Sequence, residues 1–261
     1  FKFGYAKGPI DSLNGRRFFT IDSEEDLEKK WPEILRQRPD FIKTILWASD
    51  EYEQRKQNKT FYGQAGLKPE FLKMIVKKAH ASNLRVSTHI NNAHDFHVAV
   101  AAGVDETAHL PITGLPPITE ADAKLAARRG VVVVTTCSVP ASLPPPILPR
   151  SILPQVLQVQ KENLQLLHKQ GVTLAIGSDI PSDSSVEEFE YIRKLGLFDN
   201  LTLLKMWTEN TPKTIFPKRK IGALKEGYEA SFLALESNPL DDLTNVRKIR
   251  YRFKQGHLLR P

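Results

Sequence analysis

The chain has 261 residues, 41% of them hydrophobic and 26% charged, which is typical of a globular protein with one large domain or a domain and an appendage. No segment approaches the roughly 18 consecutive apolar residues of a membrane span, no export signal opens the sequence, and the single cysteine excludes an internal disulfide while leaving the compartment open. The net charge of +7 comes from basic clusters far apart in the sequence without a nucleic-acid-binding motif, so we expect a soluble chain with no nucleic-acid or membrane partner.

From residue 40 onward, short apolar runs alternate with helical patterns, which is typical of βα units. Residues 41–46 predict a buried strand, and the polar residues 50–67 that follow predict a long loop over a binding face. A helix is predicted to begin at Pro69, because a proline suits the first helical turn and the apolar residues from Phe71 to Ala79 recur at helical spacing.

The same alternation continues to residue 210. A helix should begin near Thr119 and Asp122 and end at Gly130, because these residue types suit helix ends. Residues 131–136 are so apolar that they predict a strand buried on both faces, and the proline-rich residues 139–154 predict a second long loop. The other predicted strands are residues 84–90, 104–110 and 172–177, and the other predicted helices are residues 93–102, 155–170, 185–194 and 200–210.

Five strands that each feed a helix fit strands 4 to 8 of a (β/α)8 TIM-like barrel, although a doubly wound sheet would give the same order. The last forty residues differ, because a turn-rich link precedes residues 230–235 and 249–258, which predict antiparallel strands without crossover helices. We therefore expect a partial barrel domain, residues 1–221, followed by the C-terminal part of a small β-sandwich domain, residues 222–261.

Four side chains that can bind a metal lie near the ends of the predicted strands. Lys43 lies on the first strand, His89 and His109 end the next two, and Asp179 follows the last. Singly, a histidine there is more often structural, and an aspartate after Gly-Ser can cap a helix or a turn. Because catalytic residues of a parallel barrel project from the C-terminal strand ends, the four together indicate a site for zinc or another divalent transition metal.

The segments that carry these residues resemble the amidohydrolase superfamily, specifically its metal-dependent dipeptidase- and prolidase-like branch related to imidazolonepropionase. The matching stretches are PDFIKTIL, VSTHINNAHDFHVAVAAGVDETAHLP, LAIGSD and TENTPKTIFPKRKIGALKEGYEASFLALESNPL, which extend over nearly the whole chain. The resemblance implies a binuclear Zn²⁺ site in which Lys43, carboxylated on its amine, bridges the two metals. His89 and His109 would each supply one ligand, and Asp179 would complete the set.

The resemblance also implies an enzyme that hydrolyses amide bonds of a dipeptide or an N-acylated amino acid. Metal-bound hydroxide would be the nucleophile, and Asp179 would be the general acid and base. Only a neutral amine adds carbon dioxide, and the burial that we expect for Lys43 in its apolar strand favours the neutral form. Lactone and phosphotriester hydrolysis and deamination stay open, since the same site serves them, but a bridging lysine argues against a mononuclear deaminase.

One motif of the family is missing from this sequence. Family members complete the first metal site with a His-x-His pair on strand 1, but no such pair occurs here, and residues 1–10 resemble the end of strand 3. Lys43, His89 and His109 would complete the second site, whereas the first would keep only Lys43 and Asp179. We expect the first strands to be absent and the open strand edges to be covered by the missing N-terminal segment, by a second chain such as another copy, or by a rearranged sheet. The alternative is a truncated chain without catalysis.

The remaining candidates have simpler interpretations. His94 and His97, spaced as His-x-x-His on a helix, predict residues at the surface or beside the site, and Cys137 predicts a packed small residue. Exposed side chains are expected for His80, His168 and His257. Candidates for lining a substrate pocket, in or beside the loop after the first strand, are Trp47, Tyr52 and Tyr62.

Overall fold

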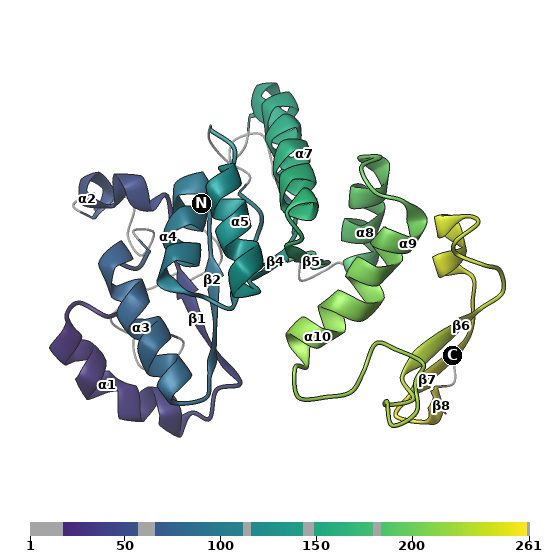
Figure 1. Cartoon of the computed structure of the whole chain (residues 1–261), viewed down its shortest axis with the longest axis horizontal. Helices are drawn as coiled ribbons and strands as arrows, with labels where there is room; N and C mark the ends of the chain where they lie inside the picture. Colours follow the sequence, from purple (N-terminus) through teal and green to yellow (C-terminus); the bar gives the residue numbers. More distant parts are fainter. Residues whose placement is uncertain (1–17, 57–65, 112–115, 143–148, 180–183, 260–261) are drawn as a thin grey trace. The chain divides into compact units, whose positions relative to one another are not determined.

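The computed structural model describes residues 18–56, 66–111, 116–142, 149–179 and 184–259 (Figure 1). The chain divides into two compact units, the first formed by Phe1–Val133 with Pro140–Val172 and the second by Val134–Val139 with Thr173–Pro261. The α-helices are α1 (Glu24–Arg36), α2 (Tyr52–Arg55), α3 (Pro69–Ala81), α4 (Ala93–Ala102), α5 (Glu120–Arg129), α6 (Val139–Ser142), α7 (Leu153–Lys169), α8 (Ser185–Lys194), α9 (Asn200–Lys205) and α10 (Thr211–Ile215). The strands are β1 (Phe41–Ile45), β2 (Arg85–His89), β3 (Glu106–Ala108), β4 (Val132–Val134), β5 (Thr173–Ala175), β6 (Phe232–Leu235), β7 (Ile249–Lys254) and β8 (His257–Leu259). Short 3-10 helices are η2 (Ser49–Glu51), η4 (Arg150–Ile152) and η6 (Leu243–Arg247), and η5 (Met206–Asn210) is a π-helix.

Strands β1 to β5 form a parallel sheet in the order of the sequence, and β6, β7 and β8 form a separate antiparallel sheet. In the parallel sheet Lys43 lies opposite Ser87, and Ile45 lies opposite His89. His89 in turn lies opposite Ala108 of β3. The predicted α/β class, with a parallel sheet and a small antiparallel appendage, is confirmed.

The two faces of this sheet differ in what covers them, since successive strand residues point to opposite sides. Thr44 and Thr88 lie on the buried face, where their hydroxyl oxygens are 2.8 Å apart. Figure 1 shows α3, α4 and α5 following one another along these strands. Lys43 and Ile45 point to the opposite face, where both side chains are exposed. The buried core of α3 and α4 consists of Leu72, Ile75, Val76, Ala79, Phe96, Ala99 and Val100.

Local sequence signals set several helix boundaries as predicted. The Thr119 hydroxyl accepts a 3.1 Å hydrogen bond from the Asp122 amide at the start of α5, and Gly130 ends the helix with a φ of 67°. Helix α8 spans its predicted residues behind a capping box made by Ser184 and Glu187. Helix α3 begins at Pro69 as predicted, and α4 spans its predicted range.

The predictions for one strand and for the two long loops differ from the structure. Strand β4 has three residues, and Val132 and Val134 are only half-buried, so the strand is not buried on both faces. The predicted loop at residues 139–154 contains α6 and the start of α7, because prolines fit the first turn of a helix, as Pro154 does in α7. The predicted loop at residues 50–67 contains η2 and α2, while residues 57–65 lie outside the described residues.

Helix α1 was not predicted, although the sequence carries a signal for it. Ser23 accepts a 3.0 Å hydrogen bond from the Asp26 amide, and three acidic residues occupy the first turn, where the helix dipole favours negative charge. Trp31 on this helix is buried, and its indole N–H donates a 3.3 Å hydrogen bond to the hydroxyl of Ser82, which follows α3. Helix α1 therefore packs as part of the first unit.

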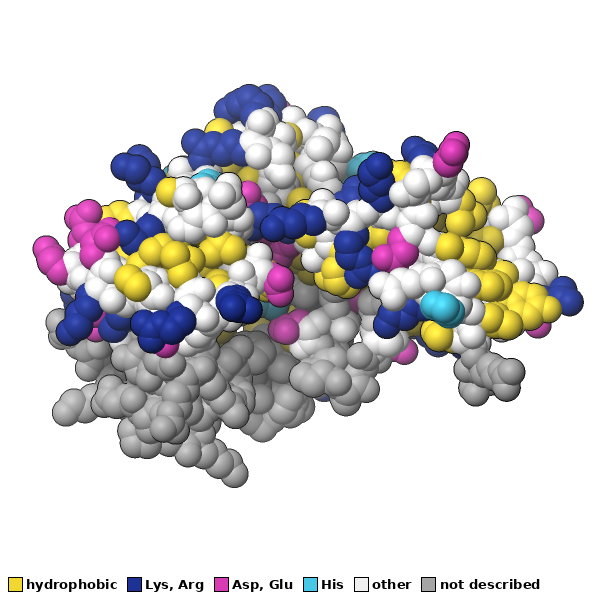
Figure 2. Space-filling model, turned by 90° about the horizontal axis from the view of Figure 1, so that it is seen from below, with side chains coloured by type: hydrophobic (Ala, Val, Ile, Leu, Met, Phe, Trp, Pro, Cys, Tyr) yellow, Lys and Arg dark blue, Asp and Glu magenta, His cyan; other side chains and the backbone are white. Residues whose placement is uncertain are grey.

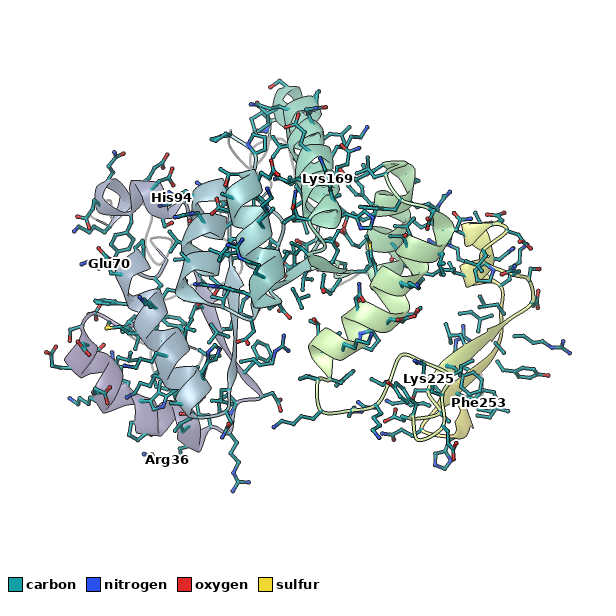
Figure 3. All side chains as sticks on the ribbon, viewed as in Figure 1. Arg36, Glu70, His94, Lys169, Lys225 and Phe253 are labelled. Carbon is teal, nitrogen blue, oxygen red and sulfur yellow. The ribbon has the colours of Figure 1, made fainter. Side chains whose placement is uncertain are left out.

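The C-terminal sheet is a meander whose last two strands were predicted as one. Gln255 and Gly256 turn the chain between β7 and β8 with φ angles of 51° and 78°. The rings of Phe232 and Phe253, which are register partners, stack with centroids 4.7 Å apart, and Figure 3 labels Phe253. Leu233 and other large apolar side chains are exposed, and Figure 2 shows hydrophobic side chains gathered at the right-hand end, where Figure 1 has these strands.

The domain boundary between residues 221 and 222 stays a prediction. None of the described helices is long and apolar enough to cross a membrane.

Gly177 lies just beyond β5 in the second unit, and we expect its replacement by alanine to destabilise that unit. A Cβ there would lie 2.6 Å from Cγ1 of Val134, which is too close for two carbon atoms. Overpacking of this kind costs about 1–3 kcal/mol, so the urea midpoint of Gly177→Ala should fall. The double variant Val134→Ala/Gly177→Ala should lose less stability than the sum of the single variants, and additive losses would exclude this contact as the cause.

Candidate metal centre

His89 and His109 lie side by side at the ends of neighbouring strands. His89 is the last residue of β2 and lies opposite Ala108, and His109 directly follows Ala108. The centroids of the two imidazole rings are 4.4 Å apart, with the planes at 72°. His109 has a φ of 84°, a left-handed conformation that costs a non-glycine residue on the order of 1–3 kcal/mol and is typical of functional sites.

Lys43 belongs to the same face of the sheet as His89. Its register partner is Ser87, two residues before His89, and Lys43 Nζ lies 3.5 Å from Ser87 Oγ. Ser87 Oγ in turn donates a 2.8 Å hydrogen bond to Glu106 on β3. The expectation that Lys43 is buried in an apolar strand is wrong, because its side chain is exposed on the face that the helices do not cover.

The pKa values of both histidines are lowered by burial and by the charge of Lys43. Burial, together with the positive charge of Lys43, lowers the pKa of His89 to about 3. Burial also lowers the pKa of His109 well below its ordinary value, with His89 and Lys43 as the next causes. Both rings are therefore neutral at physiological pH, the form in which an imidazole nitrogen binds a metal. Two neutral imidazoles in edge contact supply two nitrogen donors that fit a divalent transition metal, and Lys43 beside them would add a third donor only in a deprotonated or carboxylated form.

The lowered pKa of His89 predicts how stability depends on pH in the metal-free protein. Because the pKa of His89 is about 3 in the folded state and about 6.5 in the unfolded state, the unfolded state binds the extra proton between these values. Stability should fall as the pH falls below about 6.5, by at most about 1.4 kcal/mol per pH unit for this histidine. Urea unfolding of wild type and His89→Gln between pH 7 and pH 4 checks this, since the variant should have the shallower slope. Equal slopes would exclude His89 as the source.

Asp179 belongs to the second unit and lies four residues beyond the end of β5. Its side chain is exposed, and its φ of 53° is again left-handed. Thr136 also has a left-handed conformation, with a φ of 49°. Its amide donates a 3.0 Å hydrogen bond to the Gly177 carbonyl, which joins the chain beyond β4 to the chain beyond β5. Ala48, His109, Thr136 and Asp179 all have left-handed conformations shortly after a strand ends.

A metal site in the part of the chain that the structure describes needs the lysine as well as the histidines. No three side chains among the described His, Cys, Asp and Glu residues are grouped so that they could hold a metal ion. The His-x-His pair that the family resemblance would add is absent from the sequence. Lys43, His89 and His109 are brought together in the first unit, whereas Asp179 is described in the second.

The simpler interpretations of the other histidines and of Cys137 hold. His94 and His97 are exposed on α4 (Figure 3 labels His94), and His97 Nδ1 lies 2.7 Å from an Asp122 oxygen. Cys137 is buried with Sγ 3.7 Å from the Thr135 carbonyl, and burial raises the pKa of its thiol. The described chain also exposes His80, His168 and His257.

Trp47 is the one predicted pocket residue for which the structure gives a contact with the site. Its indole stacks on the His89 imidazole with centroids 5.1 Å apart and planes 6° from parallel. Tyr52 is half-buried on α2, and Tyr62 lies outside the described residues.

Two fully buried carboxyl groups, Asp95 and Glu188, were not predicted from the sequence. Glu188 on α8 accepts hydrogen bonds of 2.7 and 2.8 Å from the amides of Cys137 and Ser138, beyond β4, and burial raises its pKa. In sequence such residues look like ordinary acids of a first helical turn, which the helix dipole favours. Their only distinguishing sign is a position next to buried apolar residues, Phe96 and Phe189.

Comparison with known proteins gives consistent matches. The model of the amidohydrolase family matches residues 51–259. Ochratoxinase from Aspergillus niger is 30% identical over 250 residues, which is 92% of this chain and 50% of that protein, so the chain spans half the length of this relative. The crystal structure of A. niger ochratoxinase superposes with a TM-score of 0.75 at 26% identity, over 97% of this chain and 58% of the other. A Xaa-Pro dipeptidase with bound methionine has a TM-score of 0.70 at 18% identity over 92% and 59% of the two chains, which is a likeness of fold alone.

The family model covers most of the chain, and the fold and the relatives agree with it. The predicted resemblance is therefore confirmed at the level of the family. The chain belongs to the amidohydrolase family.

Proposed function

We propose that this chain forms the active-site part of a metal-dependent hydrolase of amide bonds, with dipeptides or N-acylated amino acids as substrates. The observation that carries the proposal is the edge contact of two imidazoles, both neutral, beside a lysine at the C-terminal end of parallel strands. The name of one relative says that it acts on ochratoxin, and one structural neighbour is a Xaa-Pro dipeptidase. A small amide substrate is the partner that this proposal requires.

His89, His109 and Lys43 would hold the metal, with zinc as the ion we propose and two ions per complete site. Neutral ring nitrogens of both histidines would be ligands. Lys43 would first lose its ammonium proton to solvent; the neutral amine would then add carbon dioxide, release a second proton and offer two carbamate oxygens. When bound, a divalent cation supplies Lewis acidity, which polarises a carbonyl and makes water a better nucleophile at neutral pH.

Asp179 would be the general base and then the general acid of the reaction. Its carboxylate would accept a proton from the attacking water and deliver it to the leaving amine nitrogen, which must be protonated before the C–N bond breaks. An exposed carboxylate beyond a strand end is accessible for this role. Trp47, stacked on His89, would supply an apolar wall beside the scissile bond.

A substrate screen with a matched histidine control tests the proposal. The full-length protein, loaded with zinc, is assayed for amine release from dipeptides and N-acylated amino acids, and for turnover of lactones, phosphotriesters and aminated bases. We expect amide hydrolysis that His89→Gln removes and His97→Gln keeps, since His97 is an exposed residue on α4. Turnover of only the other substrates would replace the proposed substrate class, and no turnover with no bound zinc would indicate a non-catalytic chain.

A further inference from the structure

The carboxylate of Asp95 is buried where α4 begins, yet its hydrogen-bond donors come from two other segments. Asp95 is 0% exposed. One oxygen accepts from the Ser49 amide at 2.7 Å and the Ser49 hydroxyl at 2.6 Å, and the other accepts from the amides of Ala48 and Asn91, both at 2.9 Å. Asp95 therefore joins the backbone beyond β1 to the backbone beyond β2.

The segment that Asp95 holds has an irregular backbone that needs support. Ala48 has a φ of 42°, a left-handed conformation that is unfavourable for alanine. Arg55 donates a 2.6 Å hydrogen bond to the Ala48 carbonyl, so this residue is held on both its amide and its carbonyl side. The Asn92 side chain, which accepts from the Asp95 amide at 2.9 Å, fixes the place of Asp95 itself. A buried carboxylate is costly unless it is fully hydrogen-bonded, and here three of its donors are backbone amides and the fourth is the Ser49 hydroxyl.

The residues next to these donors belong to the candidate metal centre. Trp47 immediately precedes Ala48, and its indole stacks on the ring of His89, which lies two residues before Asn91. We propose that Asp95 is a positioning residue that holds the Trp47 indole against the His89 imidazole. This fixes the orientation of the imidazole and the apolar wall beside it. Only the catalytic consequence rests on the proposed function.

Asp122 is a matched control for Asp95. Each aspartate is the third residue of its helix, and each amide donates to the capping side chain, Asn92 for Asp95 and Thr119 for Asp122. Asp122 is also buried, but its carboxylate contacts the Thr119 hydroxyl and His97. Its replacement tests the general cost of losing such an acid without changing the loops at the metal centre.

The test uses fluorine NMR of the full-length, metal-free protein labelled with 5-fluorotryptophan. Trp47→Phe assigns the Trp47 resonance, His89→Ala gives its position without the stacked ring, and the Trp31 resonance reports whether the first unit stays folded. In Asp95→Asn an amide NH2 group replaces one of the two accepting oxygens, so one set of donors loses its acceptor and faces another donor. The Trp47 resonance should therefore move toward the position that it has in His89→Ala. Ser49→Ala, which removes one donor, should produce a smaller shift in the same direction, and Asp122→Asn should leave the resonance in place.

An unchanged Trp47 resonance in both Asp95→Asn and Ser49→Ala, or an equal shift in Asp122→Asn, would overturn the proposal. In the zinc-loaded protein, kcat/KM of Asp95→Asn should fall about 10–100-fold, as for other residues that orient a ligand, while Asp122→Asn keeps the wild-type value. If the resonance shifts but no variant, wild type included, hydrolyses an amide, the positioning role stands and the proposed function fails. If wild type is active and the resonance does not shift, the positioning role fails alone.

Discussion

Replacing Lys43 with alanine is expected to remove both metal binding and amide hydrolysis. In the proposed site Lys43 would add a third donor to the two histidines, and the described His, Cys, Asp and Glu residues contain no group of three that could hold a metal by themselves. Losing a residue that only supports a ligand costs about 10–100-fold in affinity or activity, so losing a ligand should cost more than about 100-fold in kcat/KM. Zinc content and amine release, measured on the same preparation, check this.

Chemical rescue separates a ligand role of Lys43 from a structural one. A short carboxylic acid such as propionate can enter the space left by the side chain and offer two oxygens, as a lysine carbamate would. We expect propionate to restore part of the zinc binding and activity of Lys43→Ala and to leave wild type unchanged. Lys77→Ala, an exposed lysine on α3, should behave as wild type. A Lys43→Ala protein that keeps its zinc and its activity would refute the assigned role.

Replacing Asp179 with asparagine is expected to lower kcat by about 10²–10⁴-fold with a much smaller change in KM, because the general acid and base is lost. Asparagine has nearly the same shape and tolerates the left-handed backbone that Asp179 adopts, with its φ of 53°, so the loss should be chemical. The unfolding midpoint should therefore stay close to that of wild type.

The same substitution at a helix cap is the control for Asp179. Asp199 caps α9 by accepting a 2.7 Å hydrogen bond from the Thr202 amide, a role that asparagine fills equally well. Asp199→Asn should keep the wild-type kcat. If Asp179→Asn also keeps it, the proton must be handled by another residue.

The elements that could be predicted from the sequence are those with strong local signals. Helices α3, α4 and α8 lie where they were predicted, because helical patterns alternate regularly with apolar runs along the chain and, for α3, Pro69 suits the first helical turn. The contact between the His89 and His109 rings could be predicted because parallel strands end at one edge of a sheet. Lys43 lies in the middle of β1, and its place on the same face as His89 follows from the alternation of side chains along the strands. For the two histidines, that argument needs only the order of the strands and the residue at each end.

Other features depend on long-range packing that local patterns do not carry. The exposure of Lys43 is set by what covers the second face of the sheet, and an apolar strand looks the same in sequence whether one face is covered or two. The short helices α2 and α6 fall below the length at which helical periodicity is visible. The proposed role of Asp95 depends on its hydrogen bonds with Ala48 and Ser49, which lie 47 and 46 residues away in the sequence.

The most direct test is anomalous diffraction at the zinc absorption edge, with crystals of the full-length protein grown in the presence of zinc. The account predicts a zinc peak about 2.0–2.1 Å from one ring nitrogen of His89 and one of His109, with continuous density joining it to the end of Lys43. Zinc bound only at surface histidines such as His94 and His97, with none between His89 and His109, would contradict it.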